Sequence, residues 1–337
     1  MVSALHADVA GARPADFPAL ALRVFDYQRT RNPLYRAYLE LVGRVDAAPR
    51  HWRDIPCAPI GLFRGHDVRS GDWTPEATFA SSGTTGATTS RHPVRDLARY
   101  ARNCRRGFRQ LVGELSDYCL LALLPGYIER GDSGLVAMVD DFVARARPGS
   151  GFFLDDFAGL RARCAAAAAS GTPVLLWGVS FALLDLIEEG GLLCLPARSI
   201  VVETGGMKGR REELTREQLH RRLRAGLRVA TASGEFAPAP IWSEYGMTEL
   251  QSQAYRAPGA PFRPAATLRV AIRDLTDPFA LLPEGRGGAI NVYDLANVDT
   301  LAFLQTDDLG RARADGGFDV VGRIDYAIVR GCSQLAA

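Results

Sequence analysis

Short apolar runs separated by helical stretches are the feature that most limits how this chain can fold. They begin after Thr78 and cover residues 119–124, 174–176, 199–202 and 288–292. Buried strands that alternate with crossover helices are typical of the α/β class. We therefore expect an α/β core over residues 78–325, in a chain whose 337 residues can bury a sizeable interior.

The first 77 residues follow a different pattern. Apolar residues in 17–25 and 35–42 are spaced for amphipathic helices, and Pro56, Pro59 and Gly61 then interrupt the spacing. We expect residues 1–77 to form a mainly helical segment packed on the core. At the other end of the core, we expect residues 326–337 to form a tail.

Composition excludes several classes of function. The formal net charge of +2 gives no reason to expect a nucleic-acid partner. The longest apolar stretches, residues 174–187 and 118–124, are shorter than a membrane span, and the N-terminus lacks an export signal. We therefore expect a cytoplasmic protein with no membrane span.

Cysteine and lysine usage narrows the chemistry further. The six cysteines are scattered without a CxxC pair, and only five histidines accompany them, so neither a disulfide framework nor a zinc site is predicted. Any functional thiol should act alone. Lys208 is the only lysine among 40 cationic residues. Since arginine cannot replace a compact ammonium on a flexible stem, this one lysine is a candidate functional group.

The strongest local motif is the loop TFASSGTTGATTS at residues 78–90. Glycines let backbone N–H groups approach a polyphosphate closely, and serine and threonine hydroxyls add donors. It is not a Walker loop, because no Gly-Lys-Ser/Thr follows. Taken alone, an ordinary turn is an equally reasonable interpretation. The candidate phosphate ligands are Ser81, Ser82, Gly83, Thr84, Thr85 and Gly86.

Three further motifs follow in order. SEYGMTEL at residues 243–250 combines an aromatic ring, a glycine, a hydroxyl and a carboxylate, which suit a base, a phosphate and Mg²⁺. TDDLG at residues 306–310 places carboxylates where ribose hydroxyls could bind, and GRID at residues 322–325 comes shortly after. In this order, SSGTTG, YGMTE, a TxD step and GRxD resemble the core motifs of acyl- and aryl-adenylate-forming enzymes.

Other segments resemble one branch of that superfamily, the acyl-protein synthetases (LuxE-type) of fatty-acid reductase systems. They are residues 124–141, ETGGMKG at 203–209 and RGCS at 330–333. This resemblance implies a two-step, ATP- and Mg²⁺-dependent ligase. A fatty acid and ATP would form acyl-AMP, and the acyl group would then move to an enzyme cysteine as a thioester. A partner of the acyl-CoA reductase type would take it onward.

The resemblance also implies a role for each matched position. The loop at residues 81–86 would hold the triphosphate, Gly205 and Gly206 would line the adenine, and Tyr245, beside Gly246 and Met247, would stack on it. Thr248 would touch the α-phosphate and Glu249 would bind Mg²⁺, while Asp308 and Arg323 would hold the ribose. The alternatives are that Tyr245 is a core residue and that Asp308 is a turn former.

One departure from the superfamily concerns the catalytic lysine. Most adenylate-forming enzymes continue past GRxD into a mobile domain that carries it, whereas this chain stops at Ala337. We therefore expect the large N-terminal-domain core without the mobile C-terminal lysine domain, a layout typical of the acyl-protein synthetase branch. Activation joins two anions and needs positive charge, for which Lys208 is the candidate and a solvent-exposed lysine the alternative. Arg91 could serve instead of the Pro-Lys that often follows the loop.

Cys332 is the predicted acyl carrier. A thiolate is the nucleophile in such a transfer, and Arg330 offers a nearby positive charge. The alternative is an incidental terminal cysteine. For the acyl pocket, Trp177, Gly178 and Phe181 follow an apolar strand and open a helix, although an ordinary strand-to-helix turn explains them equally well.

Two rival functions remain open at this point. The same adenylate could be transferred to coenzyme A or a carrier protein, as in phenylacetate-CoA ligase-like enzymes. Alternatively, the chain could be a non-catalytic nucleotide-binding subunit of a reductase complex.

Overall fold

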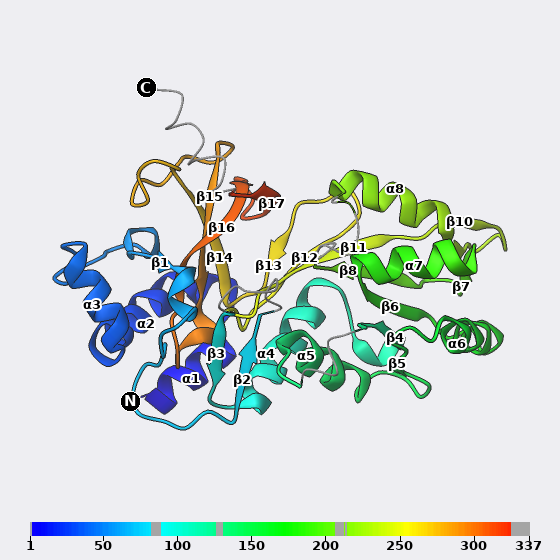
Figure 1. Ribbon diagram of the computed structural model, residues 1–337, viewed down its shortest axis with the longest axis horizontal. Helices are drawn as coiled ribbons and strands as arrows, with labels where there is room; N and C mark the ends of the chain where they lie inside the picture. The colour runs from blue at the N-terminus through cyan, green and yellow to red at the C-terminus, as the bar shows by residue number, and fades with distance from the viewer. Residues whose placement is uncertain (1, 82–88, 126–130, 206–211, 213, 325–337) are drawn as a thin grey trace. The chain divides into compact units, whose positions relative to one another are not determined.

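The computed structural model describes residues 2–81, 89–125, 131–205, 212 and 214–324. These residues form two compact units (Figure 1). One unit combines described residues from Met1–Thr74 and Ala266–Ala337, and the other is drawn from Pro75–Ala265. The division differs from the predicted segments, because the last strands belong with the N-terminal helices rather than with the central sheet.

In the described residues, the unit made from both chain ends, unit 1, contains three α-helices and a mainly antiparallel sheet. The strand order is β1-β16-β15-β14, with β17 paired to β16. Only β1 runs parallel to its neighbour. The elements are α1 (Val2–Gly11), α2 (Phe17–Arg31), α3 (Pro33–Leu41), β1 (Ala58–Pro59), β14 (Leu268–Arg273), β15 (Gly287–Asp294), β16 (Phe303–Ala312) and β17 (Phe318–Arg323).

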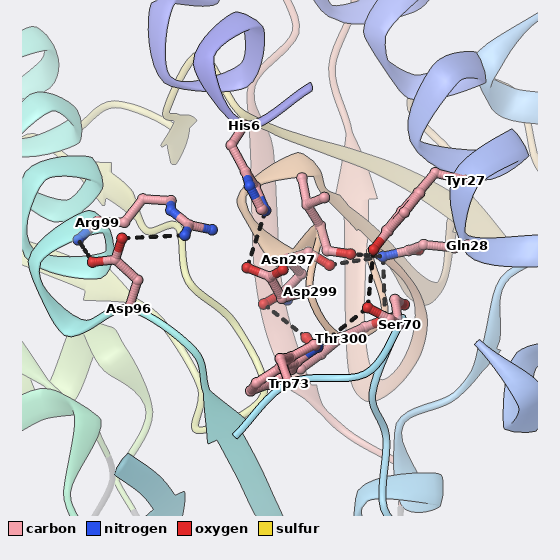
Figure 2. Close-up of polar contacts among 11 residues, drawn as sticks. His6, Tyr27, Gln28, Ser70, Trp73, Asp96, Arg99, Asn297, Asp299 and Thr300 are labelled. Atoms are coloured by element: carbon pink, nitrogen blue, oxygen red, sulfur yellow. Dashed lines mark hydrogen bonds and ion pairs between the residues drawn. The ribbon is translucent and has the colours of Figure 1, made fainter. Parts of the chain in front are cut away.

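A buried polar network explains why the two chain ends share one unit (Figure 2). The side chain of Gln28 in α2 donates from Nε2 to the carbonyl of Asn297 at 2.7 Å, and its Oε1 accepts from the N–H of Ala302 at 3.0 Å. The Ser70 hydroxyl donates to the carbonyl of Thr300. These bonds satisfy backbone groups of the β15–β16 connection, which burial would otherwise leave without water.

The continuous unit, unit 2, is built on a seven-stranded sheet with the order β13-β12-β11-β8-β6-β4-β5. Its five strands from β11 to β5 are parallel, whereas β12 and β13 are antiparallel. The strands are β4 (Cys119–Leu123), β5 (Gly151–Phe152), β6 (Val174–Val179), β8 (Ile200–Thr204), β11 (Ile241–Tyr245), β12 (Ala254–Arg256) and β13 (Arg263–Pro264).

Smaller sheets and five helices complete unit 2 (Figure 1). A hairpin of β2 and β3 precedes the helices, and β7, β9 and β10 form a three-stranded sheet. The bounds are β2 (Ala77–Ala80), β3 (Arg91–Val94), α4 (Leu97–Leu111), α5 (Gly134–Val143), α6 (Phe157–Ala169), α7 (Ser180–Gly190), β7 (Leu193–Leu195), α8 (Arg216–Gly226), β9 (Leu227–Ala230) and β10 (Phe236–Pro238).

Local sequence accounts for these elements. Every residue of β4, β6 and β8 is buried, which is why β4, β6 and the first three residues of β8 read as apolar runs. Helix starts carry side-chain caps: Asp96 accepts from the N–H of Arg99 at 2.7 Å, and Thr215 forms a capping box with Gln218. The predicted runs at 119–124, 174–176 and 199–202 are confirmed as parallel strands. The run at 288–292 is also a strand, but it lies in the antiparallel sheet of unit 1.

None of the helices in the described part of the chain is both long enough and apolar enough to cross a bilayer.

Candidate active site

The predicted YGMTE motif lies at the carboxyl end of β11 in unit 2. Tyr245 ends the strand and is 7% exposed, with its ring 5.9 Å from that of Phe262. The chain then turns, and the N–H of Leu250 donates to the carbonyl of Met247 at 3.1 Å. Ligands of open α/β sheets bind at this edge, where the carboxyl ends of parallel strands meet.

Two side chains hold this turn against neighbouring elements. His92 in β3 is fully buried, and its Nδ1 lies 2.7 Å from the carbonyl oxygen of Thr248, to which it donates. Burial lowers the pKa of His92 to about 4, while the bond to Thr248 acts in the opposite sense. Asn103 in α4 donates to the carbonyl of Gln251 at 2.7 Å. The chain after β11 is therefore tied to the β2–β3 hairpin through His92 and to helix α4 through Asn103.

Gly205 follows β8, next to β11 in the sheet. The register pairs Glu203 with Ser243, so the ends of the two strands lie side by side. Gly205 has φ +69°, a left-handed conformation that costs a residue with a Cβ roughly 1–2 kcal/mol. Its carbonyl accepts from the Ser180 hydroxyl at 3.0 Å. The structure thus brings the predicted adenine glycine to the same edge as Tyr245.

The sequence interpretation missed a cluster on one face of this edge. His220 in α8 points Nε2 at Glu203 Oε1, 3.2 Å away, and at Ser243 Oγ, 3.4 Å away. Arg216 lies 3.8 Å from the same Glu203 oxygen, and Ser180 donates to the other carboxylate oxygen at 3.3 Å. Glu203 is only 5% exposed, so these contacts hold a charge inside unit 2.

A second carboxyl, that of the half-buried Glu244, accepts from the hydroxyl of Thr204. Glu244 and Thr204 alternate along their strands with Ser243 and Glu203, so they project from the opposite face. The pKa of Glu244 is raised to about 7, mainly by burial; the hydrogen bond from Thr204 lowers it, and the nearby Glu203 charge raises it. The missed signal was a pair of carboxylates, Glu203 and Glu244, within two neighbouring strands of the central sheet.

The structure describes only the base of the predicted phosphate loop. Ser81 follows β2, and its hydroxyl accepts from the N–H of Ser90 at 3.0 Å, while its own N–H donates to the Ser90 carbonyl at 3.0 Å. The loop therefore joins two antiparallel strands, and β3 lies between it and helix α4. Residues Ser82, Gly83, Thr84, Thr85 and Gly86 lie outside the described part.

The predicted ribose pair is brought together in unit 1. Asp308 in β16 lies directly opposite Arg323 in β17, and Arg323 Nε is 3.3 Å from Asp308 Oδ1. Asp308 is 7% exposed, whereas 71% of the Arg323 side chain is exposed. A buried carboxylate with an open arginine beside it presents both an acceptor and a donor fork to a polar ligand.

The three predicted acyl contacts are core residues of unit 2. Trp177 is fully buried, with its ring centroid 5.8 Å from that of Phe142 and 6.2 Å from that of Tyr255. A Cβ on Gly178 would come within 2.7 Å of Leu183, and Phe181 is 2% exposed at the start of α7. Core packing accounts for all three, and their contact with an acyl chain stays a prediction.

Glu249, the predicted Mg²⁺ ligand, lies in the turn after β11 and is 8% exposed. Across the described ranges no group of three or more histidine, cysteine or acidic side chains is arranged to hold a metal ion. A single carboxylate is nonetheless a common Mg²⁺ arrangement, because this ion keeps several waters and substrate phosphates as its other ligands. Gly206, Lys208 and Cys332 lie outside the described residues.

No protein-family model and no curated protein sequence matches the chain. Among solved structures, the chain resembles an open conformation of 2-hydroxyisobutyryl-CoA ligase in complex with 2-HIB-AMP and CoA. The TM-score is 0.59 at 13% identity, over 90% of this chain and 73% of the ligase. It also resembles an ATP-bound RpMatB–BxBclM chimera, with a TM-score of 0.50 at 19% identity, over 73% of this chain and 47% of the chimera.

At these identities the comparisons speak to the fold. The match extends over most of the described elements of both units, and the chain spans about half the length of the chimera. The expected α/β fold class is confirmed, and the chain has the fold of the N-terminal domains of adenylate-forming enzymes.

Proposed function

We propose that this protein activates a carboxylic acid with ATP to give an acyl-adenylate. The fold shared with a ligase bound to 2-HIB-AMP supports this, and so does the place of the motif residues within it. The observation that carries the proposal is the meeting of Gly205, Tyr245 and the 247–250 turn at one carboxyl edge of the parallel sheet. In activation, a carboxylate oxygen attacks the α-phosphorus of ATP and pyrophosphate leaves.

In this proposal each motif residue has a chemical role. Tyr245 stacks on the adenine that Gly205 and Gly206 line, and Thr248 contacts the α-phosphate. Asp308 and Arg323 hold the ribose, and the loop at residues 81–86 holds the triphosphate. Glu249 would hold Mg²⁺, which offsets phosphate charge when bound. Lys208 supplies the remaining cation near the reacting oxygens.

We further propose transfer of the acyl group to Cys332. The thiolate attacks the acyl carbon, a thioester forms, and AMP leaves. The described cysteines support this choice. Burial raises the pKa of Cys57, Cys119 and Cys164, so these thiols are poor nucleophiles at neutral pH. Cys104 is fully buried, while Cys194 is partly accessible and serves as a matched control.

The acyl-protein synthetase (LuxE-type) resemblance is the basis for this second step. It also implies a fatty acid as the substrate and a reductase partner that receives the acyl group. A second candidate acceptor is coenzyme A. It is favoured by the fold match over 90% of the chain to a ligase whose complex contains CoA. The two candidates share activation and differ only in the thiol that receives the acyl group.

The test of activation is ATP–pyrophosphate exchange by the purified protein across a panel of short, long and aromatic carboxylic acids. Exchange that depends on one class of acid supports the proposal and identifies the substrate class. Absence of exchange with every acid, by a protein that binds ATP, would favour the non-catalytic nucleotide-binding subunit. Thioester formation with added CoA in a Cys332→Ser variant would favour the CoA ligase.

A further inference from the structure

A pocket of about 310 Å³ lies entirely within unit 1, on residues that none of the predicted nucleotide contacts includes. Pockets for small molecules begin at about this size. The lining comes from the segment between α3 and β1, the loop after β14, and strand β15. It consists of Arg44, Arg53, Asp54, Ile55, Pro56, Cys57, Pro278, Phe279, Leu281, Asn291 and Tyr293.

Two exposed arginines stand on the lining, and Asp54 is its only acidic residue. The Arg44 guanidinium lies 4.7 Å from the ring centroid of Phe279, and within the described ranges no carboxylate pairs with it. Arg53 lies 3.5 Å from Glu284, an ion pair in which both side chains are more than 40% exposed. Such an exposed pair is weak, so Arg53 can exchange its partner for a ligand at little cost.

The interior of the pocket is polar although it is deeply buried. Tyr293 is 0% exposed, and its hydroxyl makes no hydrogen bond of good geometry to a described residue, with Cys57 and Asn291 beside it. A buried hydroxyl without a partner is costly unless something else satisfies it. Asn291 accepts from Arg273 through Oδ1 at 3.0 Å, which leaves the amide nitrogen as a second donor.

One wall of the pocket is apolar and fixed in place. Phe279 and Leu281 belong to the loop after β14, where Leu281 forms a bridge with Arg273. The side chain of Gln305 in β16 donates to the carbonyl of Pro278 at 3.1 Å. These contacts attach the loop to the sheet, and the Phe279 ring lines the pocket. A ligand would therefore not have to order the loop.

We propose that this pocket binds a small organic anion, a carboxylate or a phosphomonoester, whose charged end lies at Arg44 and Arg53 and whose uncharged part packs on Phe279. Guanidinium groups match the planar or tetrahedral oxygens of both anions. The buried Tyr293 and Asn291 side chains form the inner part of the lining, behind the two arginines. This site is separate from the acid and ATP contacts of the proposed reaction, so it would hold an additional ligand.

The experiment measures binding of phenyl phosphate, benzoate and benzyl alcohol to the full chain by calorimetry. The variants are Arg44→Gln, Arg53→Gln and Tyr293→Phe, with Arg36→Gln as a control that removes one exposed arginine from α3. We expect one of the two anions to bind, and each pocket arginine variant to weaken that binding about tenfold. Tyr293→Phe, which removes a hydroxyl that is not accessible, and Arg36→Gln should each change the affinity less than twofold.

Three results would overturn the proposal. The first is benzyl alcohol binding as tightly as the anions. The second is an affinity that no pocket variant changes. The third is a loss of phenyl phosphate binding in Arg323→Gln but not in Arg44→Gln, because this result would place the anion at the predicted ribose pair. Because Arg44 is exposed, its variant should fold even if Tyr293→Phe does not. The anion that binds decides between the carboxylate and the phosphomonoester.

Discussion

His92 donates a hydrogen bond from Nδ1 to the carbonyl oxygen of Thr248, over 2.7 Å and inside the core of unit 2. The two residues are 156 positions apart in the sequence. The bond joins two parts of the predicted site. One is the turn with the predicted phosphate and Mg²⁺ contacts, and the other is the hairpin that bears the predicted phosphate loop. A neutral imidazole is needed at this place, because a second ring proton would bring a charge into an apolar interior.

This geometry predicts how stability depends on pH through His92. Its folded pKa of about 4 lies below the ordinary value of 6.5. As pH falls from about 6.5 to 4, the unfolded chain takes up a proton that the folded chain does not, so the free energy of unfolding decreases by up to about 3 kcal/mol. We expect His92→Gln to remove this dependence, measured as urea unfolding at pH 4.5, 5.5, 6.5 and 7.5.

Glu244 should act in the opposite direction. Its folded pKa of about 7 lies above the ordinary 4.5, so the folded chain keeps a proton that the unfolded chain loses. The free energy of unfolding therefore falls as pH rises from about 4.5 to 7, again by up to about 3 kcal/mol. In Glu244→Gln the His92 effect remains alone, and stability should rise with pH across this window.

In the wild-type protein, the combined contribution of His92 and Glu244 to the free energy of unfolding should change little between pH 4.5 and 6.5, because their effects have opposite signs. The His92→Gln and Glu244→Gln slopes should therefore differ in sign. Glu217→Gln, on the exposed surface of α8, is the matched control and should follow the wild type. Parallel curves for all four proteins would contradict both assignments.

Asp308 and Arg323 provide a prediction about the nucleotide. We expect Arg323→Gln to weaken ATP binding about tenfold, since a hydrogen bond to a charged group contributes roughly 1.5–3 kcal/mol. Stability should change by less than about 0.5 kcal/mol, because the arginine side chain is 71% exposed. Equilibrium binding of a fluorescent ATP analogue checks the first value. Arg313→Gln, whose arginine pairs with Asp319 in the same sheet, should bind ATP like the wild type.

Cys332 should carry a hydroxylamine-labile acyl label after incubation with ATP and a labelled acid. In Cys332→Ser the label should be lost while ATP–pyrophosphate exchange continues, because activation precedes transfer. Cys194→Ser should keep the label. A label that persists in Cys332→Ser and disappears in Cys194→Ser would move the acyl acceptor to β7.

Lys208 can be tested separately from the thiol. If its ammonium stabilises the charge that develops in activation, Lys208→Ala should lower the exchange rate by roughly a hundredfold, the size of effect seen when one such donor is removed. Lys208→Arg keeps the charge but not the compact shape, and it should recover only part of the rate. Exchange at the wild-type rate in Lys208→Ala would contradict this role.

The sequence predicted the central strands well, because parallel strands that are buried on both faces are mostly apolar. It did not predict the sheet to which a strand belongs. The run at 288–292 was expected to join the same core as β6, yet its partners are β14 and β16, and such pairing depends on contacts distant in sequence. Apolar patterning records burial and carries no information about neighbours.

The site was predictable where a motif occupies consecutive residues, as in the turn after β11. Glu203, His220 and Ser243 were missed because they come from three elements and meet only through strand register and helix packing. Glu244 stood beside the motif, but its environment depends on Thr204 in the neighbouring strand. Neither spacing nor composition contains that relationship.

The division of unit 1 between the two ends of the chain has a consequence for synthesis on the ribosome. Unit 2 is continuous, so its sheet can form as soon as residue 265 has emerged. Helices α1 to α3 must wait, because Gln28 and Ser70 find their partners near residue 300. Until then the apolar faces of these helices stay exposed and can associate with other chains. The fraction of chains that fold correctly therefore depends on how quickly the last strands are synthesised.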